Sequence, residues 1–390
     1  MKPTAHEKTN QVHPVRCDIP KDNHPLVDPI HVSSKFYFDK YEDLENLIAG
    51  SRRGYLYSRV LNPTVRSLEK SLARLQGTDD GICLSSGIAA ISTLFFTTLC
   101  AGDHVIYFIE SYKPTRYLIQ KFLAKWNISS TILSIHDHAG IENTVKETPT
   151  KLIIFESPTN PMLHVADLKK ITTLASKHGV LTALDNTFAG FHNHSEYPVD
   201  FYVHSLTKFA GGHSDALGGV ILGRQKLIDQ IRWPAAEIGS SLDAQAAYQI
   251  LKGLKTYSLR YEAGCRNALE VAKFLESHSS VEKVKYPGLT SHPQHKLAQV
   301  QLKDFGTVVS ADLRLPLTPK KFIDALQLIR PSPSLGTVES LVAPVELFYG
   351  GLLTNEQKEK SEITPQSIRI AVGIENIEDI LFDLKKALKC

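Results

Sequence analysis

The sequence predicts an α/β protein with two parts. The larger part is a mostly parallel sheet with helices on both faces, and a smaller α+β domain follows it at the C-terminal end. Three observations predict this fold. The 390 residues are enough for a large core, short apolar runs alternate with helical patterns from about residue 80, and after about residue 253 the strands and helices become shorter. Strands that alternate with helices are typical of parallel sheets, because parallel strands need crossover connections.

The predicted elements follow a simple order along the chain. Residues 1–58 are polar, rich in Pro and His and without clear periodicity, so we expect an arm that is either mobile or wrapped on a partner, such as a neighbouring subunit. Strand patterns follow at 81–86, 103–110, 151–157, 179–186 and 200–205. Helical patterns lie at 88–99, 114–126, 166–178 and, without a break, at 242–276. The expected domains are a large domain at 59–252 and a small domain at 253–390, the latter with strands in GTVVSADLRL and SIRIAVGIEN.

Composition limits the classes of function. The net charge is +3, from 44 basic and 41 acidic residues, which gives no electrostatic support for a nucleic-acid or membrane partner. The most apolar window, 87–102, is short for a membrane span, and the N-terminus lacks the apolar core of a signal peptide. Five widely spaced cysteines predict reduced thiols. We therefore expect a cytoplasmic protein that acts on small molecules.

Residues suited to ligand binding follow successive predicted strands, at the positions where parallel sheets bind ligands. In chain order they are Ser86, Gly87 and Ile88, then Tyr112, then Asn160, then Asp185, and last Ser205, Thr207 and Lys208. Carboxyl ends of parallel strands lie at one edge of a sheet, so these residues are expected to converge.

The residue types suit the parts of one cofactor. The helix start at 86–88 offers free N–H groups and a positive dipole end to a phosphate, and Ser205 and Thr207 add hydroxyl groups. A carboxylate buried at a strand end, such as Asp185, needs a cationic partner, and a protonated pyridine nitrogen would serve. Taken singly, each residue also fits an ordinary role as a helix cap or turn residue.

Tyr112 and Lys208 complete the set. A flat phenol ring such as that of Tyr112 can stack on an aromatic cofactor. Lys208 lies among small, apolar and hydroxyl residues in VHSLTKFAGGHSDALGG (203–219). A desolvated lysine near other cations can lose its proton and act as a nucleophilic amine. Phosphate, pyridinium, ring face and amine together predict pyridoxal 5′-phosphate, PLP.

The segment SLTKFAGGHSDALGG resembles the lysine loop of the Cys/Met-metabolism PLP enzymes. These are the cystathionine γ-synthases, cystathionine γ- and β-lyases, methionine γ-lyases and O-acylhomoserine sulfhydrylases. The resemblance covers roughly residues 50 to 380 and includes YSRVLNPTVRSLEKSLARLQG (57–77), ESPTNPML (156–163), LDNTFAG (184–190) and IRIAVGIEN (368–376). It implies fold type I of the PLP-dependent transferases.

The resemblance also implies roles for individual residues. Lys208 would carry PLP covalently, and Tyr112 would exchange protons with the substrate amine and the leaving group if cationic surroundings deprotonate its phenol. Tyr57 and Arg59 would reach the phosphate bound by a neighbouring subunit, in a homotetramer built from dimers with shared active sites. The implied substrate-binding residues are Arg369 for the α-carboxylate, together with Asn160, Arg116, Glu339 and Ser340.

Two segments depart from the pattern of the family. In YKPTRYL (112–118), Lys113 and Pro114 replace two glycines, and one residue is missing before Arg116. The segment VAPVELFYGGLLTNEQ (342–357) replaces a Pro-Ala and Met-Thr-His-like stretch. We expect 342–357 to line the substrate entrance and to govern substrate preference.

The leading expectation is cystathionine γ-lyase or γ-synthase type activity, which belongs to trans-sulfuration. Methionine γ-lyase, cystathionine β-lyase and O-acylhomoserine sulfhydrylase activities remain alternatives, and a catalytically silent binding protein with the same fold is another. Ser205 to Lys208 also match the S-x-x-K of serine acyl enzymes, but the S-D-N and K-T-G motifs do not occur. The histidines of HNH (192–194) and HPQH (292–295) lack further ligands at suitable spacing, so no metal is expected.

Overall fold

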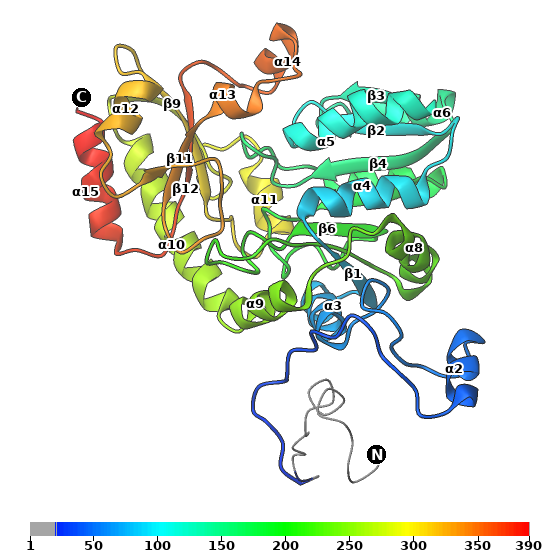
Figure 1. Ribbon diagram of the computed structural model, residues 1–390. Helices are drawn as coiled ribbons and strands as arrows, with labels where there is room; N and C mark the ends of the chain where they lie inside the picture. Colours follow the sequence, from blue (N-terminus) through cyan, green and yellow to red (C-terminus); the bar gives the residue numbers. More distant parts are fainter. Residues whose placement is uncertain (1–19, 21, 390) are drawn as a thin grey trace.

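The computed structural model describes residue 20 and residues 22–389, and these residues form two β-sheets (Figure 1). The predicted fold class is confirmed, because one sheet is large and mostly parallel and the other is smaller. Much of the predicted arm, Cys17 and Cys390 lie outside the described residues. Among the described helices, none combines the length and the hydropathy needed to cross a bilayer.

The larger sheet has seven strands in the order β1-β7-β6-β5-β4-β2-β3. Only β7 runs antiparallel to its neighbours. The five predicted strands are present, whereas β3 and β7 were not predicted. The strands are β1 (Asp80–Leu84), β2 (His104–Phe108), β3 (Ser129–Leu133), β4 (Thr150–Glu156), β5 (Leu181–Asp185), β6 (Phe201–Ser205) and β7 (Gly219–Gly223).

Both faces of this sheet are buried, because alternate residues of each strand enter different hydrophobic clusters. In β2, Ile106 and Phe108 join one cluster, whereas Val105 and Tyr107 join the other. The first cluster includes residues of α3 (Pro63–Gln76), α6 (His138–Glu147) and α7 (Leu168–Lys177). The second includes residues of α4 (Gly87–Thr98) and α8 (Gln225–Ile238).

The smaller sheet has the order β10-β11-β12-β9-β8 and its own hydrophobic cluster, which includes residues of α10, α12 and α15. Its strands are β8 (Val281–Lys285), β9 (Val308–Leu313), β10 (Arg330–Pro331), β11 (Leu341–Pro344) and β12 (Ser367–Ala371). The helices of this part are α10 (Tyr257–Glu276), α11 (His295–Gln301), α12 (Pro319–Ala325), α13 (Val345–Tyr349), α14 (Asn355–Lys360) and α15 (Ile377–Ala387). The predicted boundary near 253 falls close to the end of α9 (Ala244–Leu254) and stays a prediction.

Two helical predictions need correction. The pattern at 242–276 forms two helices, α9 and α10, which are separated at Lys255 and Thr256. The Gly253 carbonyl near the end of α9 accepts from the Arg260 guanidinium (2.8 Å). The pattern at 114–126 is helical throughout but changes type. It is α-helical in α5 (Lys113–Tyr117), π-helical at Leu118–Phe122 and 3₁₀ at Leu123–Trp126.

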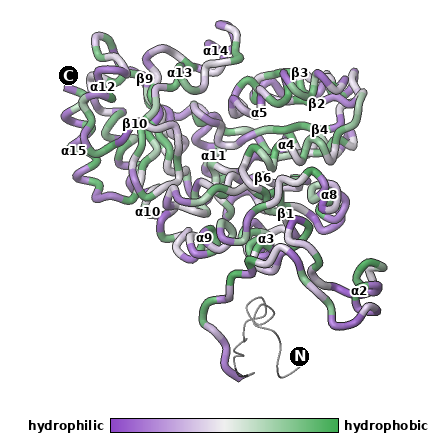
Figure 2. The backbone as a smooth tube through the Cα atoms, viewed as in Figure 1, coloured by the Kyte–Doolittle hydropathy of each residue, from purple (hydrophilic) through white to green (hydrophobic). Residues whose placement is uncertain are grey.

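The described part of the arm contains a helix that periodicity did not reveal. This helix, α2 (Tyr41–Ile48), projects from the rest of the molecule (Figure 1). It carries both hydrophobic and hydrophilic residues although none of them is buried (Figure 2). The side chains of Tyr41 and Ile48 are mostly exposed.

Candidate active site

The carboxyl edge of the seven-stranded sheet carries a pocket of about 240 Å³, here termed the inner pocket. It forms where β4, β5 and β6 end and where α4 begins. Most of the residues predicted to bind the cofactor line it: Ser86, Gly87, Ile88, Tyr112, Asp185, Ser205, Thr207 and Lys208. Asn160, predicted to bind substrate, lines it as well. The structure therefore brings together side chains that are up to about 120 residues apart in the sequence.

The start of α4 can hold a phosphate. The Ser86 hydroxyl accepts from the Ala89 N–H (3.1 Å), whereas the N–H groups of Gly87 and Ile88 have no acceptor within the described chain. The Ser205 hydroxyl also lacks a partner among these residues. A Cβ at position 87 would lie 2.8 Å from the Ser205 Cβ, so only glycine allows α4 to approach β6 this closely. Free N–H groups at a helix start suit a phosphate.

Two carboxyl groups lie side by side on β4 and β5. Glu156 and Asp185 are direct neighbours in the register of these strands. The Oδ1 atom of Asp185 accepts from the N–H (3.1 Å) and the hydroxyl (2.6 Å) of Thr187, while Oδ2 has no partner in the described part of the protein. Burial and the nearby Asp185 raise the pKa of Glu156 well above its usual value, which favours its neutral form. Burial also raises the pKa of Asp185, which a protonated pyridine nitrogen at Oδ2 would counteract.

Lys208 projects into the same pocket from the loop after β6. Its Nζ atom donates to the Ser334 hydroxyl (2.9 Å). Burial, and then the charge of Arg369, lower the pKa of Lys208 to about 8. A substantial fraction of the amine is therefore neutral near physiological pH, as a nucleophile or a base requires.

Tyr112 lies at the rim of the inner pocket. Its backbone N–H donates to Glu156 Oε1. Burial raises the pKa of the Tyr112 phenol, and Tyr349, Glu156 and Asp185 add to this effect against the opposing charge of Arg369. In the chain alone, burial thus opposes deprotonation of this phenol, and the expected role of Tyr112 in proton exchange stays a prediction.

A second pocket, here termed the outer pocket, adjoins the inner one and shares Tyr112, Lys208 and Pro333 with it. It has a volume of about 500 Å³ and opens toward the solvent. Four aromatic side chains contribute to its wall, from Tyr112, Tyr117, Phe348 and Tyr349. The two segments that depart from the family pattern, 112–118 and 342–357, therefore meet at this pocket.

Arg369 and Asn160 lie next to the junction of the two pockets. Arg369 Nη1 donates to Asn160 Oδ1 (2.9 Å), and Nη2 donates to the carbonyls of Pro333 and Ser334 (both 2.7 Å). The guanidinium lies over the Tyr349 ring, 4.8 Å from its centre. Arg369 is fully buried. Its Nε has no partner in the described part of the chain, so the guanidinium keeps a free donor. The predicted contact with a substrate carboxylate stays a prediction.

Other predicted substrate residues do not line either pocket. Ser340 bonds through its hydroxyl to Glu375 (2.8 Å) and Gly373 (2.9 Å), and Glu339 accepts from the Thr337 hydroxyl. Arg116 is buried behind Tyr112 and donates to the Tyr349 carbonyl (2.8 Å), while its Nε and Nη1 have no partner in the described structure.

Tyr57 and Arg59 also lie away from Lys208 within one chain. The Arg59 guanidinium donates to the Ala236 carbonyl (2.5 Å) and lies 3.5 Å from Glu237. Neither residue lines the inner pocket. Their predicted contact with the phosphate of a neighbouring subunit stays a prediction.

Sequence reasoning missed Glu156 and Thr187. Glu156 ends a buried strand as Asp185 does, and that signal could have identified it. Thr187 could not be found in this way, because its hydroxyl acts on Asp185 and on the Ser205 N–H (2.9 Å), which is a tertiary contact.

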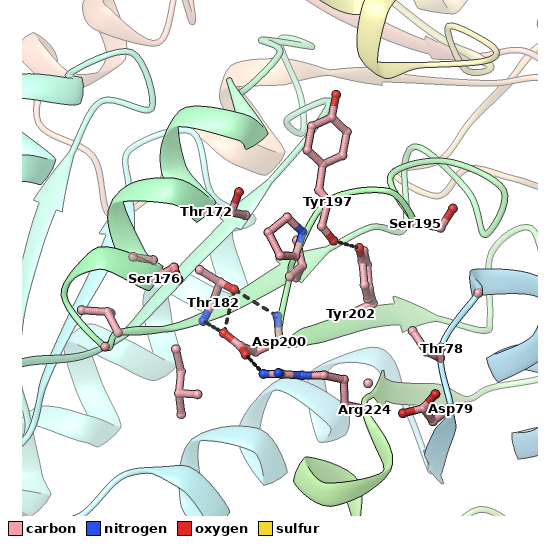
Figure 3. Close-up of a pocket in the computed structure, with 18 residues that line it drawn as sticks. Thr78, Asp79, Thr172, Ser176, Thr182, Ser195, Tyr197, Asp200, Tyr202 and Arg224 are labelled. Carbon is pink, nitrogen blue, oxygen red and sulfur yellow. Dashed lines mark hydrogen bonds and ion pairs between the residues drawn. The ribbon is translucent and has the colours of Figure 1, made fainter.

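A third pocket lies at the opposite, amino edge of the sheet (Figure 3). This amino-edge pocket has a volume of about 460 Å³ and lies where β5 and β6 begin. Asp200 accepts from the Thr182 N–H (2.9 Å), the Thr182 hydroxyl (3.0 Å) and Arg224 (2.6 Å) (Figure 3). Asp79 accepts from the Gln225 N–H (2.9 Å). In the described chain, no group of three His, Cys, Asp or Glu side chains is arranged for a metal ion.

Known proteins are similar to this chain in sequence and in fold. A family model for Cys/Met metabolism PLP-dependent enzymes matches residues 8–389. The chain is 36% identical to an L-methionine gamma-lyase of Fusobacterium nucleatum, over 93% of each chain. The structure resembles a cystathionine gamma-lyase from Lactobacillus plantarum complexed with L-serine (TM-score 0.87, 34% identity, 93% of each chain). It also resembles an O-acetylhomoserine (thiol)-lyase from Campylobacter jejuni that contains N'-pyridoxyl-lysine-5'-monophosphate at its position 205 (TM-score 0.89, 29% identity, covering 94% of this chain and 96% of that one).

Proposed function

Because the chain belongs to the Cys/Met metabolism PLP-dependent enzymes, we propose that it breaks or forms a C–S bond at Cγ or Cβ of a sulfur amino acid. The leading activity is of the cystathionine γ-lyase or γ-synthase type. One observation carries this proposal: Lys208 lies at the junction of the inner and outer pockets. A cofactor in the first and a long amino-acid side chain in the second would both reach its amine.

Lys208 has two tasks in this proposal. Lys208 would hold PLP, which, when bound, supplies an electron sink for charge developing at the substrate Cα. Its amine, when free, would take the proton from Cα and return protons along the substrate. A pKa of about 8 suits this exchange, since the amine can both accept and release a proton near neutral pH.

The two neighbouring carboxyl groups, Asp185 and Glu156, would have different roles. Asp185, with Oδ2 free, would pair with the protonated ring nitrogen and so favour charge flow into the ring. Glu156 accepts from the N–H groups of Tyr112 and of Asn160 (3.4 Å). It would therefore hold the backbone at both of these residues, which line the inner pocket.

Tyr112 would stack on the ring and act through a neutral phenol. Since its pKa is raised in the chain alone, the phenol donates a hydrogen bond and does not start as a base. A neutral phenol at the junction of the two pockets is placed to give a proton to a thiolate leaving group.

The segment 342–357 would govern which substituent is accepted. Phe348 and Tyr349 line the outer pocket, and the Tyr349 hydroxyl donates to the Pro333 carbonyl (3.1 Å). Glu346, in the same segment, pairs with Lys358 (3.1 Å) and does not line that pocket. Tyr349→Ala should therefore change the ranking of sulfur substrates more than Glu346→Ala.

The arm would complete the site of a neighbouring subunit in a homotetramer built from dimers. Two features support this: α2 exposes Tyr41 and Ile48 without a partner, and Tyr57 and Arg59 lie outside the pocket of their own chain. Refolding inactive Lys208→Ala together with inactive Arg59→Ala should restore activity in mixed oligomers. If mixed oligomers form and stay inactive, Arg59 does not act between subunits.

A single assay tests the proposed activity. The purified enzyme is supplied separately with cystathionine, homocysteine, methionine, and O-acylhomoserine plus cysteine, and 2-oxo acid, thiol and cystathionine are measured. The proposal expects cystathionine cleavage or synthesis to be fastest. If methionine cleavage is the dominant activity, the enzyme is a methionine γ-lyase. If cystathionine yields pyruvate and homocysteine, the reaction is a β-elimination. No turnover of any of them by a PLP-loaded enzyme would contradict it.

A further inference from the structure

The outer pocket has an unbalanced charge. Two lysines, Lys113 and Lys208, line it, and no Asp or Glu does. In the proposed function the Lys208 amine serves the cofactor and the Cα proton. Lys113 is then the cation that remains for the outer part of a substrate.

Lys113 itself is half-buried at the start of α5, directly after Tyr112. Its side chain lies along Gly351, so that a Cβ at position 351 would be 2.8 Å from the Lys113 Cε and 2.9 Å from its Nζ. No described residue accepts a hydrogen bond from Lys113 or forms an ion pair with it. By contrast, Lys358 on the same side of the molecule pairs with Glu346. An ammonium partly removed from water and without an acceptor favours an anionic ligand.

The second cation at this site is Arg369, which lies at the junction with the inner pocket and is the residue predicted for the α-carboxylate. Lys113 lines the outer pocket, and Arg369 contacts three residues of its wall, Tyr349, Pro333 and Ser334. Two cations beside one pocket with an aromatic wall match a molecule with two acidic groups joined by methylene groups or sulfur.

We propose that Lys113 is a specificity-determining residue that binds a carboxylate at the far end of the substrate side chain. This inference rests on the proposed function, and it names the preferred substrate class as amino acids whose Cγ or Cβ substituent ends in a carboxylate. Lys113 discriminates against substituents that end in a methyl group, because these leave its ammonium unpaired.

Turnover of two esters tests the role of Lys113. O-succinyl-L-homoserine and O-acetyl-L-homoserine share the bond to be broken, and only the first ends in a carboxylate. The ratio of their kcat/KM values should fall about tenfold in Lys113→Met, as expected for loss of one charge-assisted hydrogen bond. Lys113→Arg should keep most of the ratio. Lys121→Met, an exposed lysine on the following turn that lines neither pocket, is the control and should leave the ratio unchanged.

Gly351→Ala tests the position of the ammonium without removing its charge. Gly351 has no positive φ, so alanine causes no backbone strain, and the three atoms nearest to its methyl group would all belong to the flexible side chain of Lys113. Displacing that end should lower the succinyl-to-acetyl ratio in the native Lys113 background. In the Lys113→Met background the same change should have a smaller effect on the ratio, since no ammonium is left to displace.

Binding of unreactive analogues separates this inference from the proposed function. L-2-aminosuberate and L-2-aminooctanoate have chains of equal length, and only the first ends in a carboxylate. Calorimetry with the PLP-loaded enzyme should show about tenfold tighter binding of aminosuberate, a preference lost in Lys113→Met and weakened by added salt. Equal or weaker binding of aminosuberate, or an unchanged preference in Lys113→Met, would overturn the inference whether or not any sulfur amino acid is turned over.

Discussion

The inner pocket and the amino-edge pocket lie at opposite edges of the same sheet and share β5 and β6, yet they differ in how their polar groups are used. The amino-edge pocket is larger, about 460 Å³ against about 240 Å³. Its carboxylate Asp200 accepts hydrogen bonds from Thr182 and Arg224 (Figure 3), and Asp79 accepts one from the Gln225 N–H. In the inner pocket, Asp185 Oδ2, the Ser205 hydroxyl and the first N–H groups of α4 have no protein partner within the described chain.

This difference shows that volume is a poor guide to a binding site. Hydrogen bonds within the protein make the amino-edge pocket a stable feature of the fold, with little left to offer a ligand. The inner pocket instead keeps donors and acceptors unsatisfied in places where parallel strands end and a helix begins. Such groups lower the stability of the chain alone and become favourable only when a complementary molecule binds.

The largest effect should come from Lys208→Ala at the inner pocket. Without its amine, covalent attachment of PLP is impossible and the base is lost, so turnover should fall by about a thousandfold or more. PLP should still bind non-covalently, because the phosphate and ring-nitrogen contacts remain. Absorbance of the bound cofactor and steady-state rates measure both outcomes, and turnover within about tenfold of wild type would contradict the assignment of Lys208.

Asp185→Asn should have the second largest effect, because the ring nitrogen loses its counter-charge. Removing one partner of a buried charged pair typically costs about 3–5 kcal/mol, or a hundredfold or more in an equilibrium or rate constant. We expect weaker PLP retention in dialysis and slower exchange of the substrate Cα proton with deuterium. If both stay within about threefold of wild type, Asp185 does not pair with the ring.

The effect of pH on the rate of PLP attachment should be smaller than the effects of these substitutions, and the rate should rise with pH. The neutral fraction of an amine rises as pH rises through its pKa, which is about 8 for Lys208. Attachment of PLP to the PLP-free enzyme should therefore accelerate about tenfold between pH 7 and 9 and then level off. A lysine with an ordinary pKa would instead accelerate about a hundredfold over this range without levelling. Stopped-flow absorbance with limiting PLP distinguishes the two profiles.

The smallest effect on activity should come from Asp200→Asn at the amino-edge pocket. This change weakens the contacts with Thr182 and Arg224, so the free energy of unfolding should fall by about 1–3 kcal/mol. PLP affinity and kcat should stay near those of wild type, as measured by titration and steady-state kinetics at a temperature where the variant is folded. A selective loss of activity without loss of stability would contradict the distinction between a structural amino-edge pocket and a ligand-binding inner pocket.

Much of the inner pocket could be predicted from the sequence, because its residues occupy strand ends that periodicity reveals. Asp185 ends a clear apolar run, and Lys208 follows another with Ser205 and Thr207 close by. Topology then places these ends at one edge. Local pattern and residue chemistry were sufficient there.

The rest depended on contacts between distant residues. Whether Arg116 and Ser340 face a ligand depends on Tyr349 and Glu375, which no periodicity connects to them. Arg260 of α10 bonds to the Gly253 carbonyl near the end of α9, and the pKa of Tyr112 depends first on its burial by residues distant in the sequence. Sequence reasoning also could not place Lys113 against Gly351, since the two segments that hold them are more than 200 residues apart.

Peptide mapping after borohydride reduction tests most directly whether the inner pocket is the cofactor site. The enzyme is saturated with PLP, reduced, digested and analysed by mass spectrometry for lysines that carry the phosphopyridoxyl group. We predict that this group is found on the peptide containing Lys208 in near-stoichiometric amount and that it is absent from this peptide in Lys208→Ala. Labelling of another lysine in its place, or an unlabelled Lys208 in a yellow, active enzyme, would contradict the assignment of the inner pocket.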